Sequence, residues 1–478
     1  MDTHFDLIVV GTGPAAAFFL YRALTHLPAS ARILVLERGA FHDHKWHIDH
    51  RDTWAERHRK TFVNHNPNKD WIYSIAVGGS SNCWYGVTPR MLPNDFKLRS
   101  LYGVGYDWPI TYNDIEPYYA QAEEIMAISG TGDGCPAPRS TPFPQPPHRF
   151  TDVDRAIKKA FPNSFTAQPT ARARLAVRNR PACCATGVCH ACPVNAKFTV
   201  INGLAGIFDD PRVTLWTETL VDRFEFSGDR VSGVICKRKK QEFTVRGDLV
   251  ACGTNGIFNP FLLQRSGLAH PWLGRGLNEQ VSVTVRLDLN GLANVGGSSI
   301  GNGTGYMFWD GEHRRKRPAA MLLTSQGTSI RLEKGRWREF VNLLFVFEDI
   351  PSQDRYVIAS KENPKIPETV YPSFSDYLEA GRKALPGLVE QIANVLPVEK
   401  IHYPSSWSNT KGNTEAHILG TTRMGTDPIE SVVDSGQVHH RYRNLVMLGS
   451  SVFPSCSPAN PTLTLSALSL RAADLLFA

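Results

Sequence analysis

Four cysteines lie within ten positions of this 478-residue chain, in the stretch CCATGVCHAC that begins at Cys183. The spacing of Cys184, Cys189 and Cys192 matches the compact part of the ligand pattern of plant-type ferredoxins, and Cys183 adds a fourth thiol next door. Thiolates this dense repel one another unless a cation or a covalent bond neutralises them. We therefore expect an occupant in the cysteine loop, residues 183–198.

Three occupancies of the cysteine loop compete. Disulfides need an oxidising compartment, and a bridge between the neighbours Cys183 and Cys184 would be strained. Zinc commonly uses two ligand pairs separated by a longer loop. An iron-sulfur cluster suits soft ligands on one short loop. The residues favour the iron-sulfur cluster and leave zinc, a disulfide or free thiols open.

A second chemical signal is the glycine-rich turn Gly11-Thr-Gly-Pro-Ala-Ala16. It follows an apolar, strand-like run at 5–10 and opens a stretch of helical spacing at 14–27. In such a turn Gly11 permits the tight bend, Gly13 lets the backbone approach a pyrophosphate, and Ala16 allows close packing of helix on strand. The helix N-terminus then stabilises the anion, so the turn predicts a dinucleotide site.

The expected ribose contact comes from Glu37, which ends a second buried strand at 31–37. It lies about twenty residues beyond the glycine turn, where a carboxylate can accept hydrogen bonds from ribose hydroxyls. We include the next residue, Arg38, in the same cofactor site. This pattern does not separate NAD from FAD.

The elements around these residues predict an α/β protein. Strand, turn, helix and strand form one βαβ unit at the N-terminus, and a buried strand at 444–449 and a helix at 464–476 return to it at the other end. Strand-like runs at 213–253, 281–287 and 340–348 and a helical pattern at 374–395 lie between. We expect a Rossmann-like nucleotide-binding domain with a parallel sheet, built from both termini and a middle piece, with a mainly β domain inserted into it.

The expected boundaries divide the chain into six segments. The nucleotide-binding domain takes 1–105, 199–272 and 426–478, the cysteine loop takes 183–198, and the connecting and substrate-binding segments take 106–182 and 273–425.

Composition excludes several function classes. The chain is 42% hydrophobic and 20% charged with a net charge of +7, values that are ordinary for a globular protein. Basic runs at 236–240 and 313–317 predict solvated loops, and neither belongs to a nucleic-acid-binding pattern, so no nucleic-acid partner is expected. The apolar stretch 5–24 is interrupted by Asp6 and the glycine turn, so we expect no transmembrane segment and no signal peptide.

Three further segments carry a family resemblance. They are GGSSNCW at 78–84, HILGT at 417–421 with RMG at 423–425, and the C-terminal run through GSSVFP at 449–454 to NPT at 460–462. Together with the glycine turn they resemble, in order, the glucose-methanol-choline (GMC) oxidoreductase family. The resemblance implies a Rossmann-like FAD-binding domain with a parallel sheet, an inserted α+β substrate domain with an antiparallel sheet, and FAD between the two domains. Some pyranose-oxidising members bind flavin covalently through a histidine near the glycine pair, where this chain has Asn82-Cys-Trp84, so non-covalent FAD is expected.

The resemblance also implies roles for individual residues. The further cofactor contacts it implies are Gly78, Gly79, Ser80, Asn82, Gly449, Ser450, Pro461 and Thr462. His417 matches the family's catalytic base, and Asn460 matches the residue that hydrogen-bonds the same substrate oxygen. A histidine suits this task because its pKa lies near neutrality.

The cysteine loop itself resembles that of bacterial FAD-dependent glucose dehydrogenases, which carry a three-iron cluster beside the flavin. This likeness implies Cys183, Cys184 and Cys189 as ligands and favours a 3Fe-4S over a 4Fe-4S cluster. Cys192 lies one residue closer than in those enzymes and is kept as a fourth candidate. A cluster accepts one electron at a time, so the loop predicts a dehydrogenase rather than an oxidase. The resemblance implies that its substrate is a sugar or related alcohol.

The expected partners are a cytochrome-like acceptor protein and a small accessory subunit. The sequence predicts a cytoplasmic protein, or a periplasmic one if a partner subunit carries it out. Two alternatives stay open. The first is an oxidase that uses oxygen and whose cysteine loop is structural, with zinc or a disulfide, and the second is a flavin-binding protein without catalysis.

Overall fold

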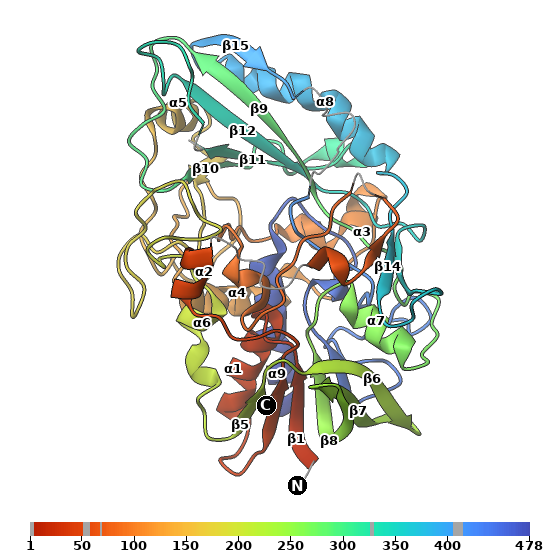
Figure 1. Ribbon diagram of the computed structural model, residues 1–478. Coiled ribbons are helices and arrows are strands. Elements are labelled where there is room, and N and C mark those ends of the chain that lie inside the picture. The colour runs from red at the N-terminus through yellow and green to blue at the C-terminus, as the bar shows by residue number, and fades with distance from the viewer. Residues whose placement is uncertain (1–3, 51–57, 67–68, 326–328, 405–413) are drawn as a thin grey trace.

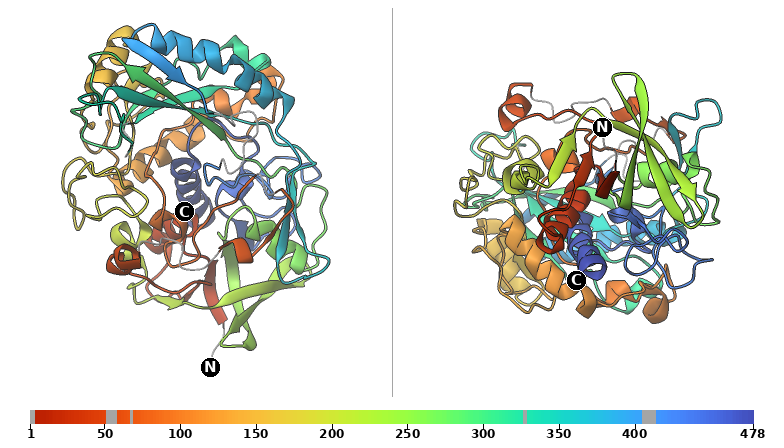
Figure 2. Two further views of the ribbon diagram at one scale, coloured as in Figure 1. Left: turned by 45° about the horizontal axis from the view of Figure 1, so that its top comes forward. Right: turned by 90° about the horizontal axis from the view of Figure 1, so that it is seen from below.

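The computed structural model describes residues 4–50, 58–66, 69–325, 329–404 and 414–478. Two sheets lie at opposite ends of the molecule, and both chain termini lie beside the first of them (Figure 1). The views in Figure 2 show segments from all parts of the chain passing between the two ends.

The first sheet has seven strands and is built mainly from parallel pairs. Its spatial order is β5 (Val213–Trp216), β2 (Ile33–Leu36), β1 (His4–Val10), β8 (Gln241–Cys252), β7 (Arg230–Arg238) and β6 (Leu220–Ser227), with β16 (Leu445–Met447) paired to β8. The long strand β8 pairs in parallel with β1 through its second half and in antiparallel with β7 through its first. This sheet confirms the Rossmann-like part of the predicted fold class.

Two helices from opposite ends of the chain pack side by side next to this sheet (Figure 1). They are α1 (Pro14–His26), which follows the glycine turn, and α9 (Pro461–Phe477). Arg22 on α1 forms a bidentate ion pair with Asp474 on α9, at 2.5 and 3.0 Å. Because α9 begins at Pro461, three residues before the predicted helix start, the NPT motif lies at its N-terminus.

The second sheet has six antiparallel strands, which confirms the predicted antiparallel sheet of the inserted domain. Its spatial order is β15 (Val398–His402), β9 (Val281–Leu289), β12 (Phe340–Phe347), β11 (Ala320–Ser325), β10 (Gly301–Gly305) and β4 (Phe165–Ala167). Helices α5 (Asp152–Ala160) and α8 (Asp376–Ala393) bury their apolar residues with one face of this sheet. Leu323 and Leu344 project from the other face toward the first sheet.

The remaining elements are short or connect the two sheets. A three-stranded sheet joins β13 (Tyr356–Ala359), β14 (Pro367–Val370) and β3 (Val63–Asn64). The other helices are α2 (His44–His50), α3 (Leu98–Tyr102), α4 (Tyr112–Met126), α6 (Val200–Gly203) and α7 (Phe258–Arg265). Because β3 and β4 come from early segments and pair with strands of the inserted region, the predicted domains interleave, and their boundaries stay a prediction.

One predicted loop differs from its expectation. Lys239 and Lys240 lie at the β7–β8 turn, as a solvated basic run should. Arg314, however, is fully buried, where it pairs with Asp95 at 2.9 Å and with Glu348 at 2.7 Å. The two carboxylates compensate its charge, so this run is partly structural. Across the described ranges, every helix is too short or too polar to cross a membrane.

Candidate active site

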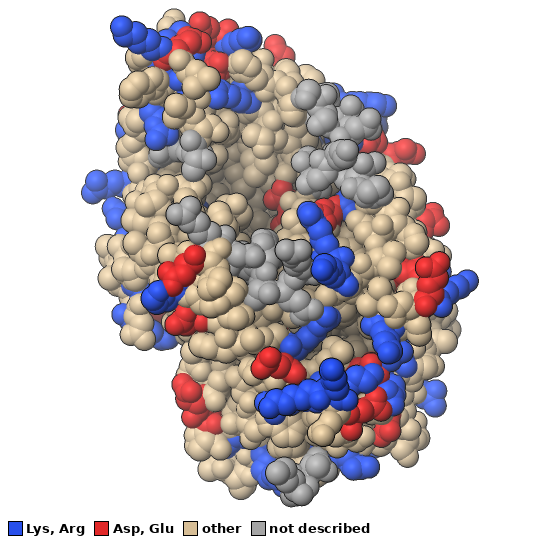
Figure 3. Space-filling view, in the orientation of Figure 1, with Lys and Arg blue, Asp and Glu red and all other residues tan. Residues whose placement is uncertain are grey.

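A cavity of about 960 Å³ lies between the two sheets. The surface in Figure 3 is hollowed between the two ends of the molecule. The residues that line the cavity come from the glycine turn, the 72–87 segment, both sheets, the segment at 414–418 and the start of α9. The fold therefore brings most of the sequence-predicted cofactor residues to one space.

The glycine turn lines one end of this cavity through Gly11 and Gly13. Gly11 has φ +94°, and a Cβ there would lie 2.7 Å from the carbonyl oxygen of Gly253, so only glycine fits. Gly13 caps the N-terminus of α1. Ala16 does not line the cavity but packs against Gly253. A Cβ added at Gly253 would lie only 3.2 Å from the Cβ of Ala16, in agreement with the predicted packing role of Ala16.

Glu37 is buried at the C-terminal end of β2 and lines the cavity next to Arg38. Its carboxylate accepts hydrogen bonds from the Thr12 backbone at 3.1 Å and hydroxyl at 2.5 Å and from the Gly39 backbone at 2.7 Å. Burial raises the pKa of Glu37, whereas these hydrogen bonds act to lower it. The glycine turn and the β2 end are thus held together by one carboxylate.

The 78–84 segment divides between lining and support. Gly79 and Ser80 line the cavity, whereas Gly78 and Asn82 do not. Gly78 has φ +91°, and a Cβ there would lie 2.8 Å from Oδ1 of Asn82. The Asn82 amide donates to the Val77 carbonyl at 2.9 Å, so this pair shapes the loop from behind.

At the C-terminal side, Gly449, Ser450, Pro461 and Thr462 all line the cavity. The N-termini of α1 and α9 therefore both open onto it. Helix N-termini stabilise negative charge, so the cavity is suited to an anionic, elongated ligand.

His417 and Asn460 lie next to each other in this cavity, with 3.4 Å between Nε2 of the ring and Nδ2 of the amide. The backbone positions them: Gly420 donates to the Ser450 carbonyl at 3.0 Å, and Leu419 pairs with Asn278. The sequence-predicted pair is thus brought together by three separate segments.

The orientation of His417 depends on Gln280, a residue that no motif singled out. The Gln280 amide nitrogen donates to the carbonyls of Ser457 and Ala459, both at 2.8 Å. Its oxygen therefore faces Nδ1 of His417, 3.0 Å away. Since an amide oxygen only accepts, Nδ1 carries the proton and Nε2 keeps its lone pair.

Charged groups also surround the histidine. Lys69 is buried in an ion pair with Glu279, and Glu279 also accepts a hydrogen bond from the His417 backbone at 2.9 Å. Burial of the ring and the charge of Lys69 lower the pKa of His417 to about 3. Glu415, the other nearby carboxyl, has a pKa raised by burial and hydrogen-bonds Ser282. The ring is therefore neutral across the ordinary pH range.

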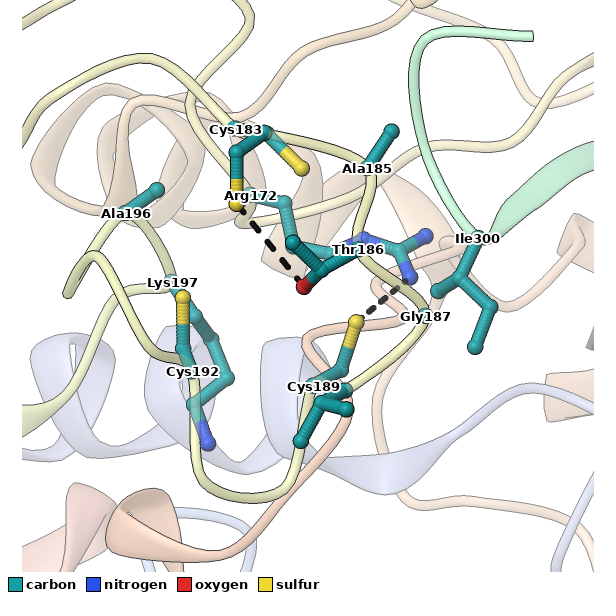
Figure 4. Close-up of a pocket in the computed structure, with 12 residues that line it drawn as sticks. Arg172, Cys183, Ala185, Thr186, Gly187, Cys189, Cys192, Ala196, Lys197 and Ile300 are labelled. Carbon is teal, nitrogen blue, oxygen red and sulfur yellow. Dashed lines mark hydrogen bonds between the residues drawn. The ribbon is translucent and has the colours of Figure 1, made fainter. Parts of the chain in front are cut away.

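The four cysteines of the cysteine loop line a separate small pocket (Figure 4). All four are free thiols; Cys189 is buried, Cys183 and Cys192 are half-buried, and Cys184 is exposed. Within the described ranges no group of three or more potential ligands is gathered closely enough to hold a metal ion as it stands. The loop thus provides a set of soft donors around one pocket rather than a preassembled metal centre.

Two buried cations line the same pocket. Arg172 donates to the sulfur of Cys189 at 3.5 Å (Figure 4) and also to Thr170, Gln168 and Gly301. Lys197 donates to the carbonyls of Asn82 at 3.1 Å, Trp84 at 2.7 Å and His190 at 3.0 Å, so it ties the cysteine loop to the 78–84 segment. Burial lowers the pKa of Lys197 to about 8.

The comparisons with known proteins agree with this arrangement. The family model described as GMC oxidoreductase matches residues 374–469. The fructose dehydrogenase large subunit of Gluconobacter japonicus is 27% identical over 84% of this chain and 80% of its own length. The chain is thus similar to GMC oxidoreductases, as its motifs predicted.

Two further proteins extend the likeness to nearly the whole chain. The 6'''-hydroxyparomomycin C oxidase of Streptomyces lividus is 26% identical over 98% of this chain and 91% of its own length. The solved structure of pyridoxine 4-oxidase from Mesorbium loti superposes with a TM-score of 0.67 and 16% identity, covering 98% of this chain and 99% of that one. The second likeness shows the fold alone.

The similarity to GMC oxidoreductases supports two predictions, that the protein is an oxidoreductase and that FAD is its cofactor. The residues of these two sites that sequence reasoning did not single out are Gln280, Lys69, Glu279 and Arg172. Each is a single polar residue without a surrounding motif. The only available signal was their charge or amide group inside otherwise apolar or strand-like stretches.

Proposed function

We propose that this GMC oxidoreductase is a dehydrogenase that oxidises a hydroxyl group of a sugar or related alcohol, with His417 as base and an iron-sulfur cluster as the exit for electrons. The observation that carries the oxidation is the unprotonated Nε2 of His417 beside Asn460 in the large cavity. The similarity of this chain to a fructose dehydrogenase large subunit supports a sugar substrate.

The cavity suits non-covalent FAD. Its glycine-lined end and the N-terminus of α1 are matched to a pyrophosphate, and Glu37 and Arg38 lie beside it for the ribose. The second helix N-terminus, at Pro461 and Thr462, favours negative charge at the other end. Bound FAD supplies the acceptor for the hydride.

Replacing Glu37 with alanine should weaken FAD binding. The ribose would lose a charge-assisted hydrogen bond, worth about 1.5–3 kcal/mol, which corresponds to about 10- to 100-fold in the dissociation constant. Flavin content after extensive dialysis, followed by titration with FAD, measures the change. Glu124→Ala, on an exposed part of α4, is the matched control. Equal affinity in both variants would exclude the ribose role of Glu37.

The residues of the chain divide the chemistry of alcohol oxidation between them. The substrate hydroxyl gives its proton to Nε2 of His417 while the hydride leaves the same carbon, so the carbinol becomes a carbonyl. The amide of Asn460 donates to the oxygen as negative charge develops there. Gln280 holds the proton on Nδ1, which keeps Nε2 available as the acceptor.

The pH dependence of flavin reduction tests the role of Gln280. With His417 at a pKa of about 3, the base is neutral above about pH 4, so the wild-type rate should not fall between pH 9 and pH 5. Gln280→Glu gives Nδ1–H a carboxylate partner, which raises the pKa of His417. A raised pKa protonates the base at higher pH, so the variant should lose activity progressively as the pH falls.

The control for this experiment is Gln264→Glu, which makes the same change at a glutamine that donates to Val357, away from His417. Lys69, Glu279 and Glu415 also face the His417 segment and remain unchanged in both variants. Gln280→Leu should lower the rate about tenfold, because it removes one hydrogen bond that selects the tautomer. Identical pH profiles for wild type and Gln280→Glu would contradict this role.

The buried cations support an anionic occupant of the cysteine loop. Every acceptor of Lys197 is a carbonyl oxygen, and Arg172 bonds a hydroxyl, an amide, a carbonyl and a thiol. A buried cation without a counter-charge costs several kcal/mol. Neutral disulfides would leave both charges uncompensated, whereas metal-bound thiolates would balance them.

We propose an iron-sulfur cluster, 3Fe-4S rather than 4Fe-4S, held by Cys183, Cys184 and Cys189, with Cys192 as a fourth candidate. When bound, such a cluster accepts electrons one at a time. The exposure of Cys184 supports electron exit at the surface to a cytochrome-like acceptor protein. The name of the Gluconobacter relative, a large subunit, supports an accessory subunit here as well.

Iron and acid-labile sulfide analysis of anaerobically purified protein tests the cluster. We expect both elements, together with bleaching of the flavin absorbance on addition of a sugar such as fructose or glucose. An oxidase is the second candidate, because the Streptomyces relative is named as one. Flavin bleaching and oxygen consumption without iron would favour the oxidase, and a flavin that no alcohol bleaches would indicate an inactive flavin-binding protein.

A further inference from the structure

Arg172 borders two cavities at once. It lines the small pocket of the four cysteines and also the large cavity that contains His417 and Asn460. Its side chain is 2% exposed, and its guanidinium points to the sulfur of Cys189 (Figure 4). The residue thus places a permanent positive charge between the two sites.

The surroundings hold this charge in one position. The guanidinium donates to the Thr170 hydroxyl at 2.8 Å, to the Gln168 amide oxygen and to the Gly301 carbonyl at 3.2 Å, as well as to Cys189. None of these acceptors is a carboxylate. An arginine stays charged throughout the ordinary pH range, so the uncompensated charge acts on the nearest group that can become anionic.

We infer that Arg172 sets the reduction potential of the centre bound by the cysteine loop, holding it at a more positive value than the thiolates alone would give. This inference rests on the proposed iron-sulfur function. Each electron that enters the centre adds one negative charge to it, and the electron leaves again to the acceptor protein. A fixed cation beside Cys189 stabilises the reduced form more than the oxidised form, because the reduced form carries more negative charge.

Lys197 is a second cation on the same pocket, 2% exposed and anchored by three carbonyl oxygens. Its hydrogen bonds to His190, Asn82 and Trp84 hold it between the cysteine loop and the 78–84 segment. It should act on the centre in the same direction as Arg172. It therefore provides an independent variant for the test.

The test is a redox titration of the purified holoenzyme, followed by electron paramagnetic resonance for the centre and by absorbance for the flavin. We expect Arg172→Gln to lower the equilibrium constant for one-electron reduction of the centre at least tenfold. This corresponds to a reduction potential that is about 59 mV more negative. Arg172→Lys keeps the charge and should retain most of the potential. Arg178→Gln, an exposed arginine nearby, is the control and should leave the potential unchanged.

The outcomes separate the inference from the proposed function. A wild-type protein without iron overturns both. The inference alone is overturned if the wild type contains iron and Arg172→Gln has the wild-type reduction potential. It is also overturned if Arg172→Gln and Arg172→Lys shift the potential equally.

If Arg172→Gln loses its iron, the iron content of Arg172→Lys decides. Iron retained in Arg172→Lys supports the role of Arg172 as counter-charge, whereas loss of iron in both variants shows a structural role and overturns the inference. Lys197→Gln should shift the potential in the same direction, and an opposite shift would also contradict the inference.

Discussion

In the His417→Ala variant we expect substrate to reduce the bound flavin about 10²- to 10⁴-fold more slowly than in the wild type, while FAD remains bound. The loss follows from the geometry of the ring, whose Nε2 is the unprotonated nitrogen facing Asn460 and the cavity. The side chain contributes no contact to the glycine turn, so the cofactor should stay. Anaerobic single-turnover reduction, followed by the flavin absorbance, measures the rate.

The control is His65→Ala, which removes an exposed histidine that pairs with Glu368 and does not line the cavity. Added imidazole gives a second readout, because a small base that enters the space left by the ring should restore part of the rate. A wild-type rate in His417→Ala would reject this histidine as the base. A slow variant that has also lost its flavin would instead indicate a structural role.

The second large effect is expected at the cysteine loop. Cys189→Ser should lose iron and block electron transfer to a protein acceptor, because a serine hydroxyl cannot replace a thiolate as a soft ligand. Substrate should still reduce the flavin at the wild-type rate, because the proton-accepting residues lie in other segments of the chain. Cys184→Ser, at the exposed thiol, should behave in the same way.

Flavin reduction and acceptor reduction must be followed separately, with cytochrome c as the acceptor, since small dyes can reach the flavin directly. Cys135→Ser is the matched control, because Cys135 lies outside the loop and its thiol donates to the hydroxyl of Tyr306. Variants that keep their iron and reduce the cytochrome normally would leave the cysteine loop with a structural role and favour the oxidase.

The parts of the fold that follow from local sequence are those in which neighbouring residues settle the structure. The glycine turn, α1 and β2 form one continuous unit, and both strands are apolar runs that only a buried parallel sheet accommodates. The strand β9 and the helix α8 likewise follow from local runs of strand-like and helical residues, whereas only the structure shows that α8 covers one face of the sheet. The start of α9 was predicted three residues too late, because the prediction followed the apolar spacing and that spacing does not include Pro461. Proline is nevertheless a favourable first residue of a helix.

Other features depend on contacts between distant segments. Arg314 was expected in a solvated run, yet it is buried because Asp95 and Glu348, far away in the chain, neutralise it. Gly78 and Asn82 belong to a motif of the family, but their side of the loop faces away from the cavity. A motif gives the identity of such residues and not the direction in which they point.

The sequence by itself determined the resemblance to GMC oxidoreductases, the dinucleotide turn and the identities of His417, Asn460 and the four cysteines, because short motifs encode them. Only the tertiary structure decided the protonation of His417, since the amide of Gln280, 137 positions away, is oriented by carbonyls at Ser457 and Ala459. It also decided that Arg172 lies between the cysteine pocket and the large cavity. The physical reason is that the hydrogen bonds of Gln280 and the surroundings of the Arg172 charge depend on contacts between segments that are distant in the sequence. A local pattern of residues does not predict such contacts.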